Sequence, residues 1–316
     1  MPPTIVDIQQ AAERIRPHAH RTPVLTCSYL NEQIGANIYL KCEHLQKVGA
    51  FKFRGACNAV FSLRDDEAAR GVATHSSGNH AQALALAARL RGIPAYIVMP
   101  SNSPAVKQAA VAGYGGQITL CEPTLAARES TLASVVAATG ATVVHPYDDD
   151  RVIAGQGTAT LELLADVPQL EMIVAPVGGG GLICGTALAA KGISPSVRVI
   201  AAEPELADDA FRSLESGVVQ PPRPPLTIAD GLRAALSERT FAIIRQHVEQ
   251  IIPVSETGII TGMRMIWERA KQVIEPSAGV GIAALLERQA EFAGKHVGVI
   301  LCGGNVDLDR LPWQVG

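Results

Sequence analysis

The chain has 316 residues, of which 47% are apolar and 18% are charged, so it can bury a sizeable core and is not expected to be disordered. Its formal net charge of −3 argues against nucleic acid or an anionic membrane as a partner. The six cysteines form no CxxC pair, the N-terminus lacks the apolar run of a signal peptide, and no apolar stretch is long enough to span a membrane, which predicts a cytoplasmic protein with reduced thiols.

The predicted elements alternate between helices and short apolar strands. Three helices are expected to end at Gly92, Gly140 and Gly294, because glycine favours the left-handed C-cap. Continuous apolar strands between helices indicate parallel sheets covered on both faces, and so an α/β fold. The expected strands are 38–42, 95–99, 117–120, 141–144, 172–177, 197–202 and 297–301, and the expected helices are 81–90, 130–139, 182–190 and 282–292.

The first candidate for chemistry is Lys52, which lies between Phe51 and Phe53 in a glycine-flanked segment. Desolvation lowers the pKa of a lysine and favours the neutral amine that Schiff-base chemistry requires. A lysine that extends toward solvent at the start of a helix is the structural alternative. The segment alone favours neither interpretation.

The second candidate is the segment Ser76–His80, with the sequence SSGNH, which leads into the predicted helix 81–90. Serine and asparagine are good N-caps, so a helix start is a sufficient structural explanation. The functional interpretation is that backbone N–H groups at this helix N-terminus bind a carboxylate.

The third candidate is the run Gly178, Gly179, Gly180 and Gly181, between a predicted strand and a predicted helix. Such a loop exposes backbone N–H groups at a helix N-terminus, which suits a phosphate, and four glycines exceed what a tight turn needs. The run is neither a Walker loop nor GxGxxG, because Cys184 stands at the third glycine position. Glu203, about 20 residues on, lies where a ribose-binding acid would be, so an NAD-dependent dehydrogenase is the alternative.

A fourth segment, 302–305 with the sequence CGGN, directly follows the last predicted strand. Ligands of open α/β sheets bind at the carboxyl ends of the strands. Both glycine-rich loops therefore indicate a site at this edge.

Together, these four segments in this order resemble the fold-type II pyridoxal-phosphate enzymes, which have a tryptophan synthase β-like fold. The most similar branch contains serine racemase, threonine/serine dehydratase and 3-hydroxyaspartate dehydratase. The resemblance covers nearly the whole chain and includes AGQGT at 154–158, TIADG at 227–231 and EPSAG at 275–279. It implies a large cofactor-binding domain of residues 1–67 and 148–316, a small domain of residues 68–147, and a cofactor between them.

The resemblance also implies roles for individual residues. Lys52 would bind the cofactor covalently and take the Cα proton, and Ser77 would lie on the opposite face of the substrate. Cys302 would meet the pyridine nitrogen, where the family usually has serine. Phe51 and Asn79 would contact the ring, Gly178 to Gly181 would hold the phosphate, and Ser76, Asn79 and His80 would bind the substrate carboxylate.

The implied reaction is a pyridoxal-phosphate-dependent β-elimination. Water would leave a small β-hydroxy amino acid, either 3-hydroxyaspartate, serine or threonine, and a keto acid and ammonia would form. A racemase on the same scaffold is the alternative, with Ser77 as the second acid. Arg128 lies in a segment that resembles the racemase and hydroxyaspartate branch. It binds a second substrate carboxylate in one hypothesis, and is a solvated helix residue paired with Glu129 or another neighbour in the other.

Two further sites are implied by the resemblance. The carboxylates of Glu203 and Asp209 and the carbonyl of Ala207 would bind Mg2+ or Ca2+, which prefer oxygen ligands. The structural alternative is that Asp208 or Asp209 caps a helix over 210–215. The protein is expected to be a homodimer, and four positions match those that bind an activating nucleotide in serine racemase of the mammalian type: Gln82, Tyr114, Lys271 and Asn305.

Overall fold

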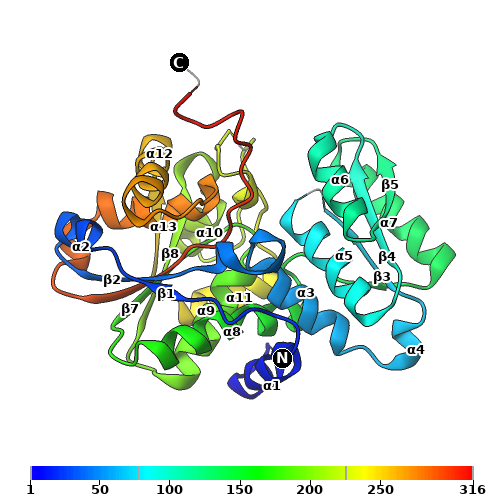
Figure 1. Ribbon diagram of the computed structural model, residues 1–316, viewed down its shortest axis with the longest axis horizontal. Coiled ribbons are helices and arrows are strands. Elements are labelled where there is room, and N and C mark those ends of the chain that lie inside the picture. The colour runs from blue at the N-terminus through cyan, green and yellow to red at the C-terminus, as the bar shows by residue number, and fades with distance from the viewer. Residues whose placement is uncertain (1, 77, 225, 315–316) are drawn as a thin grey trace.

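The computed structural model describes residues 2–76, 78–224 and 226–314. Figure 1 shows two lobes side by side, each built around its own sheet. The larger sheet has six strands, in the order β1 (Val24–Leu25), β2 (Asn37–Lys41), β10 (His296–Ile300), β7 (Met172–Pro176), β8 (Arg198–Pro204) and β9 (Gln250–Val254). The smaller sheet has four, in the order β5 (Gln117–Cys121), β4 (Ala95–Pro100), β3 (Val72–His75) and β6 (Thr142–Val143).

Helices connect the strands and cover the sheets. In the part of the chain before β7 they are α1 (Ile5–Ile15), α2 (Ser28–Ile34), α3 (Lys52–Phe61), α4 (Asp65–Ala68), α5 (Asn79–Arg91), α6 (Ala105–Gly113), α7 (Leu125–Thr139) and α8 (Asp150–Asp166). After β7 they are α9 (Gly181–Ile193), α10 (Asp209–Ser216), α11 (Glu238–His247), α12 (Glu256–Met265), α13 (Pro276–Glu287) and α14 (Gln289–Phe292). Short helical segments are η1 (Glu43–Leu45), η2 (Lys47–Gly49), η3 (Glu205–Ala207), η4 (Asp230–Leu232) and the π-helix η5 (Ile266–Ala270).

The strands within each sheet are parallel, apart from the antiparallel pair β1–β2. The predicted α/β class and mainly parallel sheets are therefore confirmed. Gly92, Gly140 and Gly294 have φ values of 74°, 70° and 75°, so the three predicted left-handed glycines are also confirmed. The predicted helix over 282–292 is different, because it begins at Pro276 and breaks at Arg288, where φ is −125° and ψ is 37°.

Helix α3 lies where the two lobes meet. Its residues Phe53 and Val60 belong to the same buried apolar cluster as Leu84 of α5 and Ile97 of β4. The strands of the smaller sheet all fall between residues 72 and 143. The division at residues 67 and 147 stays a prediction, and α3 contributes to the core on both sides of it.

The first turn of α3 is held in the larger lobe by a buried set of charges. The guanidinium of Arg54 binds Glu43 at 2.7 Å and Glu162 at 2.8 Å, and Lys41 Nζ binds Glu162 at 2.6 Å. Two positive and two negative side chains meet, so the charges balance. The network fixes the backbone turn that begins with Lys52.

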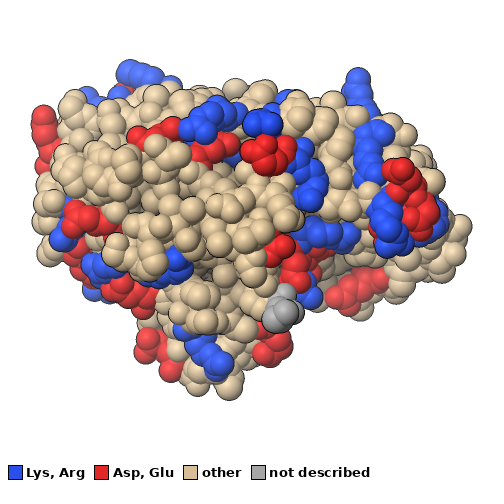
Figure 2. Space-filling model, turned by 90° about the horizontal axis from the view of Figure 1, so that it is seen from below, with Lys and Arg blue, Asp and Glu red and all other residues tan. Residues whose placement is uncertain are grey.

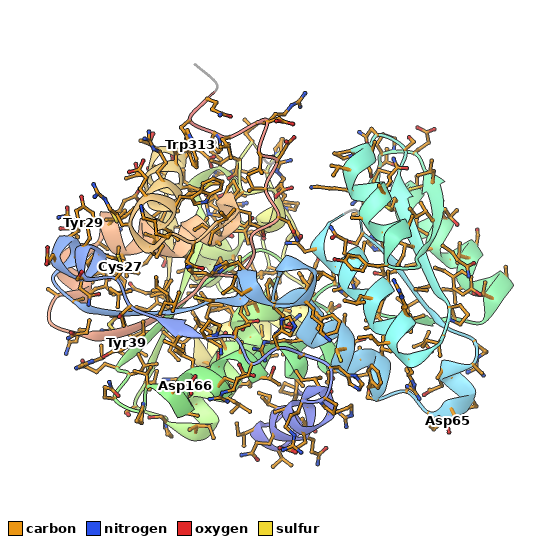
Figure 3. The ribbon with its side chains drawn as sticks, viewed as in Figure 1. Cys27, Tyr29, Tyr39, Asp65, Asp166 and Trp313 are labelled. Carbon is orange, nitrogen blue, oxygen red and sulfur yellow. The ribbon has the colours of Figure 1, made fainter. Side chains whose placement is uncertain are left out.

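The surface carries both signs of charge. Figure 2 shows Lys and Arg side chains interspersed with Asp and Glu on the face that it displays. Tyr29 and Trp313 lie on the larger lobe, away from the smaller one, and Trp313 packs edge-on against Trp267 with ring centroids 5.3 Å apart (Figure 3). Among the described residues, no helix has the length and apolarity needed to cross a membrane.

Candidate active site

The loop after β10 lies against the segment that carries Lys52. Ala50 and Gly303 form a β-bridge, and the backbone N–H of Phe51 donates to the carbonyl of Cys302 at 3.0 Å. Because β10 is central in the sheet, this contact places Lys52 at the carboxyl edge of the strands. The Cys302 thiol is buried, and burial raises its pKa, so it stays neutral.

Lys52 begins α3 and points into the protein. Its Nζ donates to the carbonyl of Pro146 at 2.9 Å and lies 5.1 Å from the centroid of the Phe51 ring. Burial lowers the pKa of Lys52 to about 8, although the nearby Cys302 and Glu275 act in the opposite direction. A substantial fraction of the amine is therefore neutral at mildly alkaline pH, as covalent chemistry on a carbonyl requires.

The four glycines form a tightly packed turn between β7 and α9. A Cβ on Gly178 would lie 2.8 Å from the backbone Cα of Leu232, and one on Gly179 would lie 2.4 Å from the Tyr147 ring. Gly180 has a φ of 94° and caps α9, which begins at Gly181. The loop therefore requires glycine for space as well as for conformation, and it places N–H groups at a helix N-terminus, as a phosphate site needs.

The segment SSGNH begins α5, with Gly78 as the cap and no side-chain hydrogen bond to it. Ser76 Oγ accepts from the backbone N–H of Gly78 at 3.4 Å. Ser77 lies outside the described residues, so its predicted position opposite Lys52 stays a prediction.

The ring of His80 is unsuited to binding a carboxylate. Its Nε2 lies 3.1 Å from the carbonyl of Val144, so Nε2 carries the proton, and the buried Nδ1 has no partner among the described residues. Burial lowers the pKa of His80 to about 3, with Lys52 adding to the effect. With Nε2 engaged, the ring presents only the unprotonated Nδ1, which accepts hydrogen bonds and cannot donate to a carboxylate, so the carboxylate role of His80 stays a prediction for its backbone N–H.

Glu275 is a buried site residue to which sequence reasoning assigned no role. It accepts from the side chain of Asn79 at 3.0 Å and from the backbone N–H of Asn305 at 3.0 Å. Burial raises its pKa to about 7, and Asp230 adds to the effect. The EPSAG segment was part of the family resemblance, but only the fold shows that its carboxylate joins the two lobes beside Asn79.

The segment 145–147 is the other part of the site that the sequence did not indicate. Pro146 accepts from Lys52, Tyr147 packs on the glycine loop, and the His145 ring contacts the rings of His75 and Tyr147 edge-on, with centroids 6.0 and 4.6 Å apart. This segment directly follows the predicted strand 141–144. That position is the one signal that would have suggested a role, because loops at the carboxyl ends of strands often contain functional residues.

Arg128 lies on α7, half-buried, and its Nε donates to the carbonyl of Thr124 at 3.4 Å. Burial lowers the pKa of His75, the residue before Ser76, and the charge of Arg128 lowers it further. Arg128 is therefore close to the start of the SSGNH segment. Within the described part of the chain Arg128 pairs with its neighbour Thr124 and forms no salt bridge to Glu129, so its role in binding a carboxylate stays a prediction.

Glu203, Ala207 and Asp209 are close together at the start of α10. Both carboxylate oxygens of Glu203 accept from helix N–H groups, Oε1 from Ala210 at 2.9 Å and Oε2 from Phe211 at 2.8 Å, and Asp209 accepts from Leu236 at 3.2 Å. Asp208 occupies the N-cap position of α10 but makes no side-chain cap hydrogen bond, and the carboxylate of Glu203 binds the helix N–H groups instead. Burial raises the pKa of both acids, that of Asp209 to about 6.

These two carboxylates fit a divalent cation. They are buried, the charge of Asp209 adds to the raised pKa of Glu203, and no salt bridge to either occurs in the described residues. Asp209 keeps one carboxylate oxygen without a described partner. Over residues 2–76, 78–224 and 226–314, no group of three His, Cys, Asp or Glu side chains is arranged to hold a metal, so backbone oxygen or water must complete the ligand set.

A lysine with a lowered pKa, a glycine loop at a helix N-terminus and a buried neutral thiol thus meet at one sheet edge. The family described as "Pyridoxal-phosphate dependent enzyme" matches residues 15–303. This chain belongs to that family. It is 53% identical over 312 residues to the beta-hydroxyaspartate dehydratase of Paracoccus denitrificans (strain Pd 1222), with 99% of both chains covered.

Other relatives belong to the same branch. The chain is 47% identical over 309 residues to the L-threo-3-hydroxyaspartate ammonia-lyase of Saccharomyces cerevisiae (strain ATCC 204508 / S288c), covering 98% of this chain and 95% of the relative. The structure of maize serine racemase superposes with a TM-score of 0.96 at 46% identity, over 99% of this chain and 97% of that one. The predicted family branch and the fold-type II architecture are confirmed.

The family also decides the question of the cofactor. Pyridoxal phosphate is the cofactor, and the NAD-dependent dehydrogenase is not retained. Glu203 was the basis of that alternative, and its carboxylate instead binds the N–H groups at the start of α10.

Proposed function

We propose that this enzyme eliminates water from 3-hydroxyaspartate and releases a keto acid and ammonia. The observation that supports the substrate choice is Arg128, a half-buried guanidinium on α7 whose charge lowers the pKa of His75, the residue before Ser76. Serine and threonine have one carboxylate, whereas 3-hydroxyaspartate has two. The dehydratase and ammonia-lyase names of two relatives support the same substrate class.

Residues from both lobes would hold the cofactor. Lys52 would bind it covalently, Gly178 to Gly181 would bind its phosphate through backbone N–H groups, and the thiol of Cys302 would meet its pyridine nitrogen. Phe51 and Asn79 would contact the ring. When bound, the cofactor supplies the electron sink for the pair released at Cα.

The substrate is oriented by its two carboxylates. The first binds the backbone N–H groups of Asn79 and His80 and the hydroxyl of Ser76, where the positive end of the α5 dipole favours an anion. The second binds the planar guanidinium of Arg128. Held at both ends, the Cα–H bond faces Lys52, whose neutral amine takes the proton.

Replacing Arg128 tests this assignment. Arg128→Ala should lower kcat/KM for 3-hydroxyaspartate by about 100-fold or more, because the second carboxylate loses its charged partner in a partly desolvated site. For serine, which has no second carboxylate, we expect a change of less than about threefold. The matched control is Glu129→Gln, which changes the neighbouring charge and should leave the ratio between the two substrates unaltered.

The substrate assignment fails if Arg128→Ala loses activity equally on both substrates or on neither. Arg128→Lys separates the contribution of the charge from that of the bidentate geometry. It keeps the charge but loses the bidentate geometry, so it should recover only part of the activity on 3-hydroxyaspartate.

Racemisation on the same scaffold is the second candidate. It is supported by the likeness to maize serine racemase and requires an acid on the face opposite Lys52, a role we propose for Ser77. Chiral analysis of serine recovered after partial turnover decides between the two. Recovery of both enantiomers would show racemisation, and recovery of unchanged serine beside keto acid would show elimination alone.

We also propose that Mg2+ or Ca2+ binds Glu203, Asp209 and the carbonyl of Ala207. The support is the buried excess of negative charge described above. The homodimer and the nucleotide effector at Gln82, Tyr114, Lys271 and Asn305 stay predictions. Sedimentation velocity and the effect of added ATP on the rate test them directly.

A further inference from the structure

His145 lies in the site beside Lys52, and the proposed elimination assigns it no role so far. It follows β6 and comes directly before Pro146, whose carbonyl accepts from Lys52 Nζ at 2.9 Å. Its ring contacts His75 edge-on, with centroids 6.0 Å apart, and His75 is close to Arg128. His145 therefore lies near both the Lys52 amine and the His75 ring.

The backbone fixes the tautomer of His145. Its Nδ1 accepts from the N–H of Asp148 at 2.9 Å and faces the N–H of Tyr147 at 3.4 Å. An Nδ1 that accepts from two amides carries no proton, so in the neutral ring the proton is on Nε2. No described residue accepts a hydrogen bond from Nε2, and in this half-buried residue that nitrogen is not among the buried atoms without a partner, so Nε2 is free to donate to a ligand.

The ring is also held neutral. Burial lowers the pKa of His145 to about 4, and the neighbouring His75 and Lys52 add to the effect, against Asp148 and Asp149. A neutral imidazole whose other nitrogen is already bonded does not give up the Nε2 proton. It is a fixed hydrogen-bond donor, and such donors stabilise negative charge that develops on oxygen.

We propose that His145 Nε2–H donates a hydrogen bond to the β-oxygen of the substrate as that oxygen leaves. The inference rests on the proposed elimination and adds a catalytic residue to it. Arg128 binds the carboxylate on Cβ, which places the hydroxyl on the same carbon beside the His75 and His145 rings.

The proton balance is complete without a proton from His145. Lys52 takes the proton from Cα, and the electron pair of that bond forms the second bond between Cα and Cβ. The bond from Cβ to oxygen breaks, its pair stays on the oxygen, and the ammonium of Lys52 returns the proton to it, so water leaves. His145 stabilises the charge on the oxygen while that transfer occurs.

The test compares two substrates that differ only in the leaving group, serine and β-chloroalanine of the same configuration. Chloride leaves without needing a hydrogen bond. His145→Phe in the holoenzyme should therefore lower kcat/KM for serine by about 100-fold, the usual effect of removing one such donor, and for β-chloroalanine by less than about threefold. His145→Gln, whose amide also donates, should recover part of the serine activity. Cofactor absorbance of the variants checks that the site is intact.

His75→Phe is the matched control, because it changes the ring in edge contact with His145 and should alter both substrates by the same factor. If His145→Phe does not retain cofactor, the activity of His145→Ala is measured with and without added imidazole, which replaces the missing ring. Imidazole should restore turnover of serine but leave that of β-chloroalanine unchanged. Equal losses on both substrates, or no loss, overturn the role of His145. A parent enzyme inactive on 3-hydroxyaspartate and on both of these substrates contradicts the proposed function instead.

Discussion

Two loops of the candidate site differ in how tightly the protein packs around them. In the glycine loop of the larger lobe, an added Cβ would meet Leu232, Tyr147 or Thr240 at 2.4–2.9 Å. In the SSGNH loop of the smaller lobe, an added Cβ on Gly78 meets nothing within 4 Å. The first loop has the close packing suited to a permanently bound group, and the second leaves space for a ligand that comes and goes.

The largest loss of activity is expected on replacing Lys52, in the larger lobe. Lys52→Ala should lower elimination by at least about 1000-fold, because it removes both the covalent attachment and the base. The variant should keep its fold, since Arg54 and its partners still hold the first turn of α3. The measurements are keto-acid release and visible cofactor absorbance after gel filtration. Full activity with covalently attached cofactor would contradict the whole assignment.

The contact of the SSGNH loop with Glu275 of the larger lobe should depend on pH. In cofactor-free enzyme the pKa of Glu275 is about 7 when folded, above its ordinary value of 4.5, so the folded state holds a proton that the unfolded state has lost. The free energy of unfolding should therefore fall as the pH rises from 4.5 through 7, by about 3 kcal/mol at most.

Glu275→Gln should flatten this dependence, and urea unfolding at pH 5 and pH 8 measures it. A variant with the same slope as the parent would show that Glu275 does not titrate in this range. Asp209→Asn is a matched control away from the two loops, because it removes a different raised carboxyl and should leave most of the Glu275 contribution in place.

A pair of alanine substitutions tests the difference in packing directly. Gly178→Ala should destabilise the protein by about 1–3 kcal/mol and weaken cofactor retention, because the new methyl group would lie 2.8 Å from the Leu232 backbone. Gly78→Ala should change the free energy of unfolding by less than about 0.5 kcal/mol. Thermal unfolding of the two variants measures this difference. Equal losses of stability would show that the two loops do not differ in packing.

The smallest expected effect concerns the proposed cation, which acts on the larger lobe alone. Chelation should lower Tm by about 2–5 °C, and Mg2+ or Ca2+ should restore it, because a ligand of the folded state stabilises by mass action. Glu203→Gln should lose this response. If its Tm responds to metal as the parent does, Glu203 serves as a helix cap only.

The sequence by itself determined the α/β class, the left-handed glycines and the positions of seven of the ten described strands, because backbone propensity and apolar pattern are encoded by adjacent residues. Strands β1, β3 and β9 were not indicated. It also indicated Lys52 and the glycine loop, because each is a compact local pattern. The break of the last long helix at Arg288 was not indicated, because no glycine or proline marks it.

Only the tertiary structure decided the electrostatic state of the site. The proton on His80 is placed by the Val144 carbonyl, and the pKa of Glu275 is set by burial beside Asn79, 196 positions away in the chain. Pro146 meets Lys52 across 94 positions. The burial of a group and the electric field that acts on it depend on which residues, distant in the chain, surround it. No local pattern in the sequence predicts those neighbours.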